Sequence, residues 1–281
     1  MKRITAILSV VVLLCLALAC SSQDRKIRLR MSNEVGLRQV HKQEMKYTWY
    51  VVVGDSVTEK GGGTDRYVST ENLLNVGEDS VLTVLDSSTS YHVVPSKDED
   101  KKLDTVEVYR ANKYMIRPDG EFVDVEFMDG KDSATVAYLR NYFEQGWPVF
   151  PTGEISVGHT WTHSTAVRMP DETINASTDF KLTNLVRESG YDCAVIEYNG
   201  NMILPVDVRE KKDFHETGVD RIELQGLMYF AYKEGVVVLV RDHWSLEADR
   251  NKTNEKTGEE SSHKIYRETD VEYWLIDVTW P

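Results

Sequence analysis

His159 and His163 have the spacing of a metal-binding pair. On a helix, residues four positions apart lie on one face, where two imidazoles can bind the same ion. The residues around Trp161 are instead typical of a strand, in which four residues span about 13 Å. Two imidazoles that far apart cannot both reach one zinc ion with bonds of about 2.1 Å. We therefore expect surface or cross-strand histidines and no metal site.

Two carboxylates, Asp124 and Glu126, have the arrangement most suited to acid–base chemistry. They lie on one side of an expected strand, about 7 Å apart, and paired carboxylates can hydrolyse glycosidic bonds. Here they alternate with Val123 and Val125, which is the pattern of a solvent-facing strand. The chain also lacks the G-x-S-x-G, H-E-x-x-H, P-loop, G-x-G-x-x-G and C-x-x-C motifs. The sequence therefore predicts neither a catalytic site nor a cofactor.

The aromatic residues are the richest candidates for ligand binding, since the chain has 6 Trp and 14 Tyr. Trp49, Trp161 and Trp274 all fall on expected strands. They either fill the core of a large antiparallel sheet or line a concave apolar pocket for an acyl chain or another apolar ligand. The sequence leaves both interpretations open, and we take these three residues as the candidate ligand contacts.

The chain has three cysteines: Cys15 and Cys20 lie near the N-terminus, and Cys193 lies far from them in the sequence. Cys193 belongs to the apolar run Cys193–Ile196 and has no neighbouring His or Lys that would activate a thiolate. We expect a buried, inert thiol there. No intramolecular disulfide is expected unless Cys20 stays unmodified.

The N-terminus has the pattern of an export signal. Two basic residues precede the apolar run 4–19, and Ala17-Leu18-Ala19 is followed at once by Cys20. This segment resembles the lipobox of bacterial lipoproteins. The resemblance implies that residues 1–19 are a signal peptide, that Cys20 receives diacylglycerol, and that residues 20–25 form a tether. Ser21 is compatible with sorting to the periplasmic face of the outer membrane, and ordinary signal-peptidase cleavage, giving a soluble periplasmic protein, is the alternative.

The remaining chain, 26–281, has the composition of a water-soluble domain. No second apolar run approaches the ~20 residues of a membrane span. We expect no nucleic-acid partner, because a chain with a net charge of −13 repels phosphate backbones. The membrane, reached through the lipid anchor, is the expected partner, together with an apolar ligand or an envelope protein.

Strand patterns cover most of this domain. Alternating and β-branched segments predict hairpins over 114–127 and 228–240, each with a glycine-containing turn. Gly61–Gly63 predicts a flexible turn or loop, and the charged stretch 249–264 an exposed hairpin loop. One helix is expected at 132–145, with apolar residues at helical spacing and a glycine after it.

An internal duplication is a further hypothesis. Thr48-Trp49 precedes Thr160-Trp161 by 112 residues, and later glycine and tyrosine positions match at nearly the same offset. The two half-units would be residues 26–131 and 151–281, joined by the helix at 132–145. We expect a mainly β (α+β) fold, an antiparallel curved sheet or open half-barrel.

Pro151 followed by Val157-Gly158-His159-Thr160-Trp161 resembles the P…V-G-x-x-W segment of uncharacterised bacterial envelope lipoproteins. That family is thought to be similar in shape to the LolA/LolB lipoprotein carriers. The resemblance implies a curved antiparallel sheet whose concave apolar face is filled by helices. It covers roughly residues 26–281.

Three functions follow in order of preference. The first is a non-enzymatic binding module for a lipid or another apolar envelope molecule. The second is a structural or accessory interaction protein of an envelope assembly, with a filled core and no pocket. The third is a hydrolase whose active-site residues are scattered along the chain. A continuous apolar cavity would favour the first, and a cleft with ionisable groups of perturbed pKa would favour the third.

Overall fold

A computed structural model describes residues 25–94, 104–128, 133–168, 173–210 and 214–281. The predicted signal peptide 1–19 and the predicted lipidation site Cys20 lie outside the described residues. So does the tether 20–25, except for Arg25.

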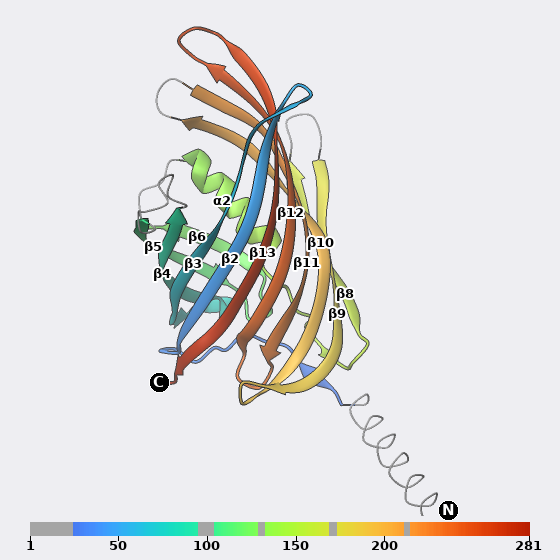
Figure 1. Cartoon of the computed structure of the whole chain (residues 1–281). Coiled ribbons are helices and arrows are strands. Elements are labelled where there is room, and N and C mark those ends of the chain that lie inside the picture. Colours follow the sequence, from blue (N-terminus) through green and yellow to red (C-terminus); the bar gives the residue numbers. More distant parts are fainter. Residues whose placement is uncertain (1–24, 95–103, 129–132, 169–172, 211–213) are drawn as a thin grey trace, which may run out of the picture.

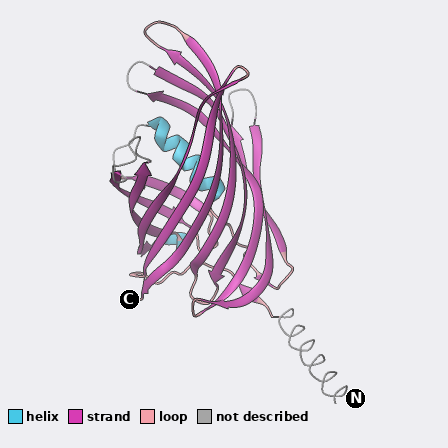
Figure 2. Cartoon of the chain, in the orientation of Figure 1, coloured by secondary structure: helices cyan, strands magenta, loops and turns pink. Residues whose placement is uncertain are grey.

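One antiparallel sheet of eleven strands forms most of the described protein (Figures 1 and 2). The strands of its first half are β2 (Arg38–Val53), β3 (Ser56–Val76), β4 (Leu82–Val94), β5 (Asp104–Ile116) and β6 (Phe122–Phe127). The strands of its second half are β8 (Thr160–Arg168), β9 (Thr173–Glu188), β10 (Tyr191–Glu210), β11 (Phe214–Ala231), β12 (Val236–Asn254) and β13 (Glu260–Thr279). Two short strands, β1 (Ile27–Arg28) and β7 (Glu154–Ile155), pair with each other in a second sheet.

The strand order in the large sheet is β6-β5-β4-β3-β2-β13-β12-β11-β10-β9-β8. Each half is a simple meander, and the pairing of β2 with β13 joins the halves in the middle of the sheet. The outer edges are β6 and β8, which do not pair with each other. The sheet curves strongly, so that its concave face surrounds the helix (Figure 1). The predicted mainly β fold with a curved antiparallel sheet is confirmed.

Helix α2 (Ser133–Gly146) lies against this concave face (Figure 2) and matches the helix predicted at 132–145. It is the one α-helix within the described ranges, which also contain a 3₁₀ turn, η1 (Glu78–Ser80). Phe143 packs toward the first half, beside Phe122 and Phe127. Tyr138 and Tyr142 pack on the second half, so the helix is apolar on two sides. None of the helical segments described is long and apolar enough to cross a bilayer.

The two halves share local features that favour the predicted duplication, which stays a prediction. Gly36 before β2 and Gly158 before β8 have nearly identical φ angles, +93° and +94°. Gly36 donates to the Leu73 carbonyl at 2.9 Å, and Gly158 donates to the Leu182 carbonyl at 2.7 Å. In both halves the leucine is followed by a bulge, at Leu74 in β3 and at Thr183 in β9.

Two expectations about loops were wrong. Gly61–Gly63 lies inside β3, where it pairs with Tyr47–Trp49 of β2. A Cβ atom on Gly61 would come within 2.8 Å of the Trp49 ring, so the glycine provides the space that this ring needs. The charged stretch 249–264 forms the ends of β12 and β13, because the two strands remain paired up to Thr253 and Glu260. Because β12 and β13 pair with each other here, the backbone N–H and C=O groups of this polar stretch have hydrogen-bond partners.

Candidate functional site

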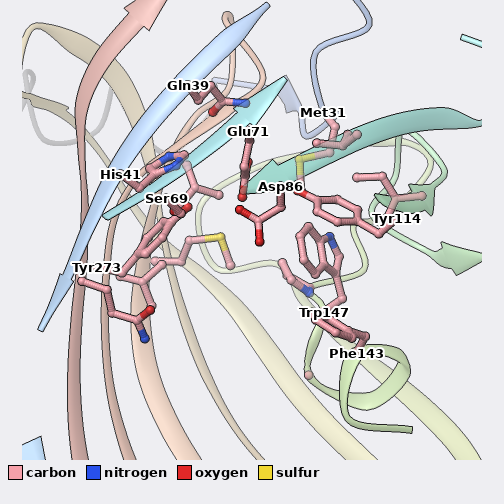
Figure 3. A pocket seen from close by; sticks show the side chains of 18 of the residues that line it. Met31, Gln39, His41, Ser69, Glu71, Asp86, Tyr114, Phe143, Trp147 and Tyr273 are labelled. Atoms are coloured by element: carbon pink, nitrogen blue, oxygen red, sulfur yellow. The ribbon is translucent and has the colours of Figure 1, made fainter. Parts of the chain in front are cut away.

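A cavity of about 410 Å³ lies between the concave face of the sheet and α2. Figure 3 shows several of its lining side chains. Strands from both halves contribute, and α2 with the segment after it supplies Phe143, Gln145 and Trp147. The volume is within the range of about 300–1,000 Å³ that is typical of small-molecule pockets. The cavity is therefore the candidate site.

The wall formed by the first half has a polar part beside its apolar lining. Gln39, Glu71, Asp86 and Asn112 face one another in register across β2, β3, β4 and β5, and make one row across the sheet. The adjacent row contains His41, Ser69 and Ser88, which also line the cavity. Residues directly opposite on antiparallel strands have Cβ atoms about 5 Å apart, so the side chains within each row are neighbours.

Glu71 and Asp86 form a pair of carboxyl groups inside this wall (Figure 3). The hydroxyls of Tyr114 and Tyr273 donate hydrogen bonds to Glu71. Burial nevertheless raises the pKa of Glu71 to about 7, because these two bonds offset only part of the lost solvation. Burial and the neighbouring Glu71 charge raise the pKa of Asp86 to about 7 as well. Two such groups side by side retain protons near neutral pH.

His41 stands next to this pair and is fixed by packing. It is 1% exposed, and its ring stacks on Tyr273 with the centroids 4.4 Å apart. Neither ring nitrogen makes a well-formed hydrogen bond. Burial lowers the pKa of His41 to about 4, against a weaker opposing effect of the Val237 backbone. The imidazole is therefore neutral at neutral pH and keeps one nitrogen as a free acceptor.

The opposite wall, from the second half, is mostly apolar. Its apolar lining side chains include Phe180, Met202, Leu224, Met228 and Val240. The main polar contact on this wall joins Tyr198 of β10 to Asp242 of β12, and the Tyr198 hydroxyl donates. This bond crosses β11 at Gly226, where a Cβ atom would come within 2.2 Å of the Asp242 carboxylate. Burial raises the pKa of Asp242 to about 6.

Specific polar contacts hold α2 over the cavity. Beyond Gly200, β10 is no longer paired with β9, which leaves the backbone of Ile203 without a strand partner on that side. Gln145 replaces that partner, because its amide donates to the Ile203 carbonyl at 2.9 Å and accepts from the Ile203 N–H at 2.8 Å. Two hydrogen bonds thus attach the last turn of the helix to a split in the sheet.

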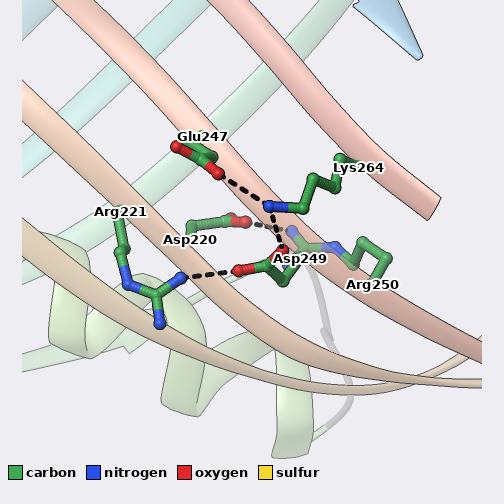
Figure 4. Close-up of polar contacts among 6 residues, drawn as sticks. All are labelled: Asp220, Arg221, Glu247, Asp249, Arg250 and Lys264. Carbon is green, nitrogen blue, oxygen red and sulfur yellow. Dashed lines mark hydrogen bonds and ion pairs between the residues drawn. The ribbon is translucent and has the colours of Figure 1, made fainter. Parts of the chain in front are cut away.

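The N-terminal part of α2 is held by a hydrogen bond to a buried ion pair. The Tyr138 hydroxyl donates to Asp220 at 2.9 Å, and Asp220 pairs with Arg250. Figure 4 shows Asp220 and Arg250 together with a second set of contacts, in which Arg221 and Lys264 bind Asp249. The side chains of Asp220 and Arg250 are 3% and 10% exposed, whereas that of Arg221 is 51% exposed.

The structure places the three predicted ligand contacts away from this cavity. The Trp161 ring stacks on Phe180 at 5.3 Å and donates to the Val149 carbonyl at 2.8 Å, within an apolar cluster. Trp49 lies over Gly61. Trp274 lies under the Lys42 ammonium, 5.6 Å from it. The tryptophans that line the cavity are Trp147 and Trp244.

The other residues singled out for their chemistry occupy ordinary positions. Glu126 pairs with Lys113 at 2.7 Å and Asp124 with Arg140, all of them substantially exposed. The Cys193 thiol is buried as predicted, and burial raises its pKa to about 11. Within the described ranges, no group of three or more His, Cys, Asp or Glu side chains could hold a metal ion.

The sequence analysis missed Glu71, Asp86 and His41. The hairpin of β3 and β4 could be expected from the turn at 78–80, but the bulge at Leu74 could not. Without that extra residue Glu71 would face Ser87, and Asp86 would point to the other side of the sheet. The one available signal was the polar character of alternate residues on β2, Gln39, His41 and Gln43.

Comparison with known proteins adds little. The chain matches no protein-family profile and no curated protein. Among solved structures it is similar to variants of a porin from Rh. blastica, two of which share 9% identity with it. These alignments cover 85% of this chain and 100% of the porin chain, with a TM-score of 0.24. Similarity at this level carries no argument about fold or function.

Proposed function

We propose that this protein is a non-enzymatic binding module for a lipid or another apolar molecule of the bacterial envelope, tethered to a membrane through Cys20. The observation that supports the binding role is the 410 Å³ cavity, whose lining is mostly apolar on the side of the second half. The N-terminal sequence supports the tether and the envelope location.

Binding explains the cavity better than catalysis does. The paired carboxyl groups, with raised pKa values, are a feature that enzyme sites also have. However, His41 makes no hydrogen bond to Ser69 or Ser88, so neither of these lining hydroxyls is paired with the imidazole as a nucleophile with its base. Cys193 is not among the residues that line the cavity.

Native mass spectrometry of the protein purified from an envelope fraction tests this proposal. We expect an extra mass that organic solvent removes. Leu224→Trp, which places an indole in the cavity, should abolish that mass, whereas Leu74→Trp should retain it because Leu74 is 46% exposed. A bare mass for the unmodified protein, or equal loading of both variants, would contradict the proposal. Release of Cys20→Ala from membranes tests the anchor.

A further inference from the structure

The polar end of the cavity contains more hydrogen-bonding capacity than the protein uses. His41 has two ring nitrogens without a well-formed hydrogen bond. One carboxylate oxygen of Asp86 is also unpartnered. Buried polar groups without partners are costly, and several of them at one place indicate that another molecule supplies the partners.

Among Asp, Glu, Lys and Arg, only acidic side chains line the cavity in the described ranges. The lining residues in the described part of the chain include Glu71, Asp86 and Asp242, and no Lys or Arg. A carboxylate or phosphate head group would therefore enter a buried acidic site with no cation to pair with, at a large electrostatic cost. A positively charged head group would instead gain charge-assisted hydrogen bonds.

We propose, resting on the binding function above, that Glu71, Asp86 and His41 hold the protonated amine of an apolar ligand. A primary ammonium has three N–H donors. The three side chains provide three acceptors on consecutive strands, since Glu71 of β3 directly faces Asp86 of β4 and His41 of β2 is diagonal to Glu71. The tail of the ligand would then lie along Met202, Leu224 and Met228 on the opposite wall.

The proposal accounts for the neutral state of His41. A protonated imidazole would repel an ammonium, whereas the neutral ring offers it an acceptor. The stacking on Tyr273 fixes the ring plane, and Tyr273 also donates to Glu71, so one residue orients two of the three acceptors.

Isothermal titration calorimetry at pH 7 with the full-length protein tests this proposal. The probes are dodecylamine, dodecanol and dodecanoate, each below its micelle concentration. We expect dodecylamine to bind at least about tenfold more tightly than dodecanol, and dodecanoate to bind most weakly. Amine binding should also release protons from the carboxyl pair, detected as a dependence of the heat on the ionisation enthalpy of the buffer.

Glu71→Gln and Asp86→Asn should each abolish the preference for the amine and leave dodecanol binding within about twofold. Having two such variants keeps the test valid if one fails to fold. Glu59→Gln, at an exposed position of the same strand, is the matched control and should keep the preference. Equal affinity for amine and alcohol, or tightest binding of dodecanoate, would overturn this inference alone. Failure of all three probes to bind would instead count against the proposed function.

Discussion

The two walls of the cavity have similar local backbone features but different lining side chains. Both come from antiparallel meanders, and both carry a bulge directly after a buried leucine, Leu73 or Leu182. The first-half wall presents Gln39, Glu71 and Asp86, whereas the second-half wall presents mainly apolar side chains. Similar local backbone features thus support two different interiors, because the inward side chains of the two halves differ. The difference gives the cavity a polar side and an apolar side, which can orient an amphipathic ligand.

The apolar wall should contribute most to stability. Phe230 on β11 is completely buried and packs on Phe150, with ring centroids 4.7 Å apart. We expect Phe230→Ala to lower the free energy of unfolding by about 3–5 kcal/mol, measured by urea denaturation. Phe214→Ala on the same strand, where the ring is 36% exposed, should cost less than about 1 kcal/mol. Equal losses would show that the wall is not a packed core.

The polar wall should make stability depend on pH. Glu71 titrates near 7 when folded and near its ordinary value of 4.5 when unfolded, so the folded state binds more protons between these values. The stabilisation is complete below about pH 4.5 and is lost as the pH rises to about 7. We expect the unmodified protein to lose roughly 3 kcal/mol relative to Glu71→Gln between pH 4.5 and 8, measured by urea denaturation.

Several titratable groups face Glu71 and share this effect. They are Asp86 on β4, Tyr114 on β5, Tyr273 on β13 and the neutral His41 on β2. Because Asp86 is coupled to Glu71, the double variant Glu71→Gln with Asp86→Asn should show the flattest pH dependence. A slope that is unchanged in the double variant would place the pH dependence elsewhere in the protein.

Side chains on the outer faces of the two walls should contribute least to the free energy of unfolding. Arg221 pairs with Asp249 at 2.7 Å, but both side chains are well exposed. Exposed ion pairs contribute about 0–1 kcal/mol, so Arg221→Ala should change the free energy of unfolding by less than about 1 kcal/mol. The same variant should leave dodecylamine binding unchanged in calorimetry. A loss above about 2 kcal/mol would mean that the outer charges hold the second half in shape.

The sequence predicted the backbone of this protein better than its site. Local patterns sufficed for the helix at 132–145 and for the hairpins over 114–127 and 228–240, because periodicity and turn residues are local properties. The carboxyl pair depends on a single bulged residue, Leu74, and a shift of one position reverses which side chains face inward. The tryptophans could be assigned either to the core or to a pocket from the sequence. Trp161 packs against the core and does not line the cavity.

The pairing of β2 with β13 has a consequence for how the chain folds. Arg38 lies opposite Thr279, so nearly the whole chain separates two strands that meet in the middle of the sheet. Each meander can form from local hairpins, but the cavity has both walls only after this long loop has closed. Contacts of such high sequence separation slow folding, and until they form, the edges of β2 and β13 are open to pairing with other chains. A chain of this topology needs protection from aggregation until its last strand is available.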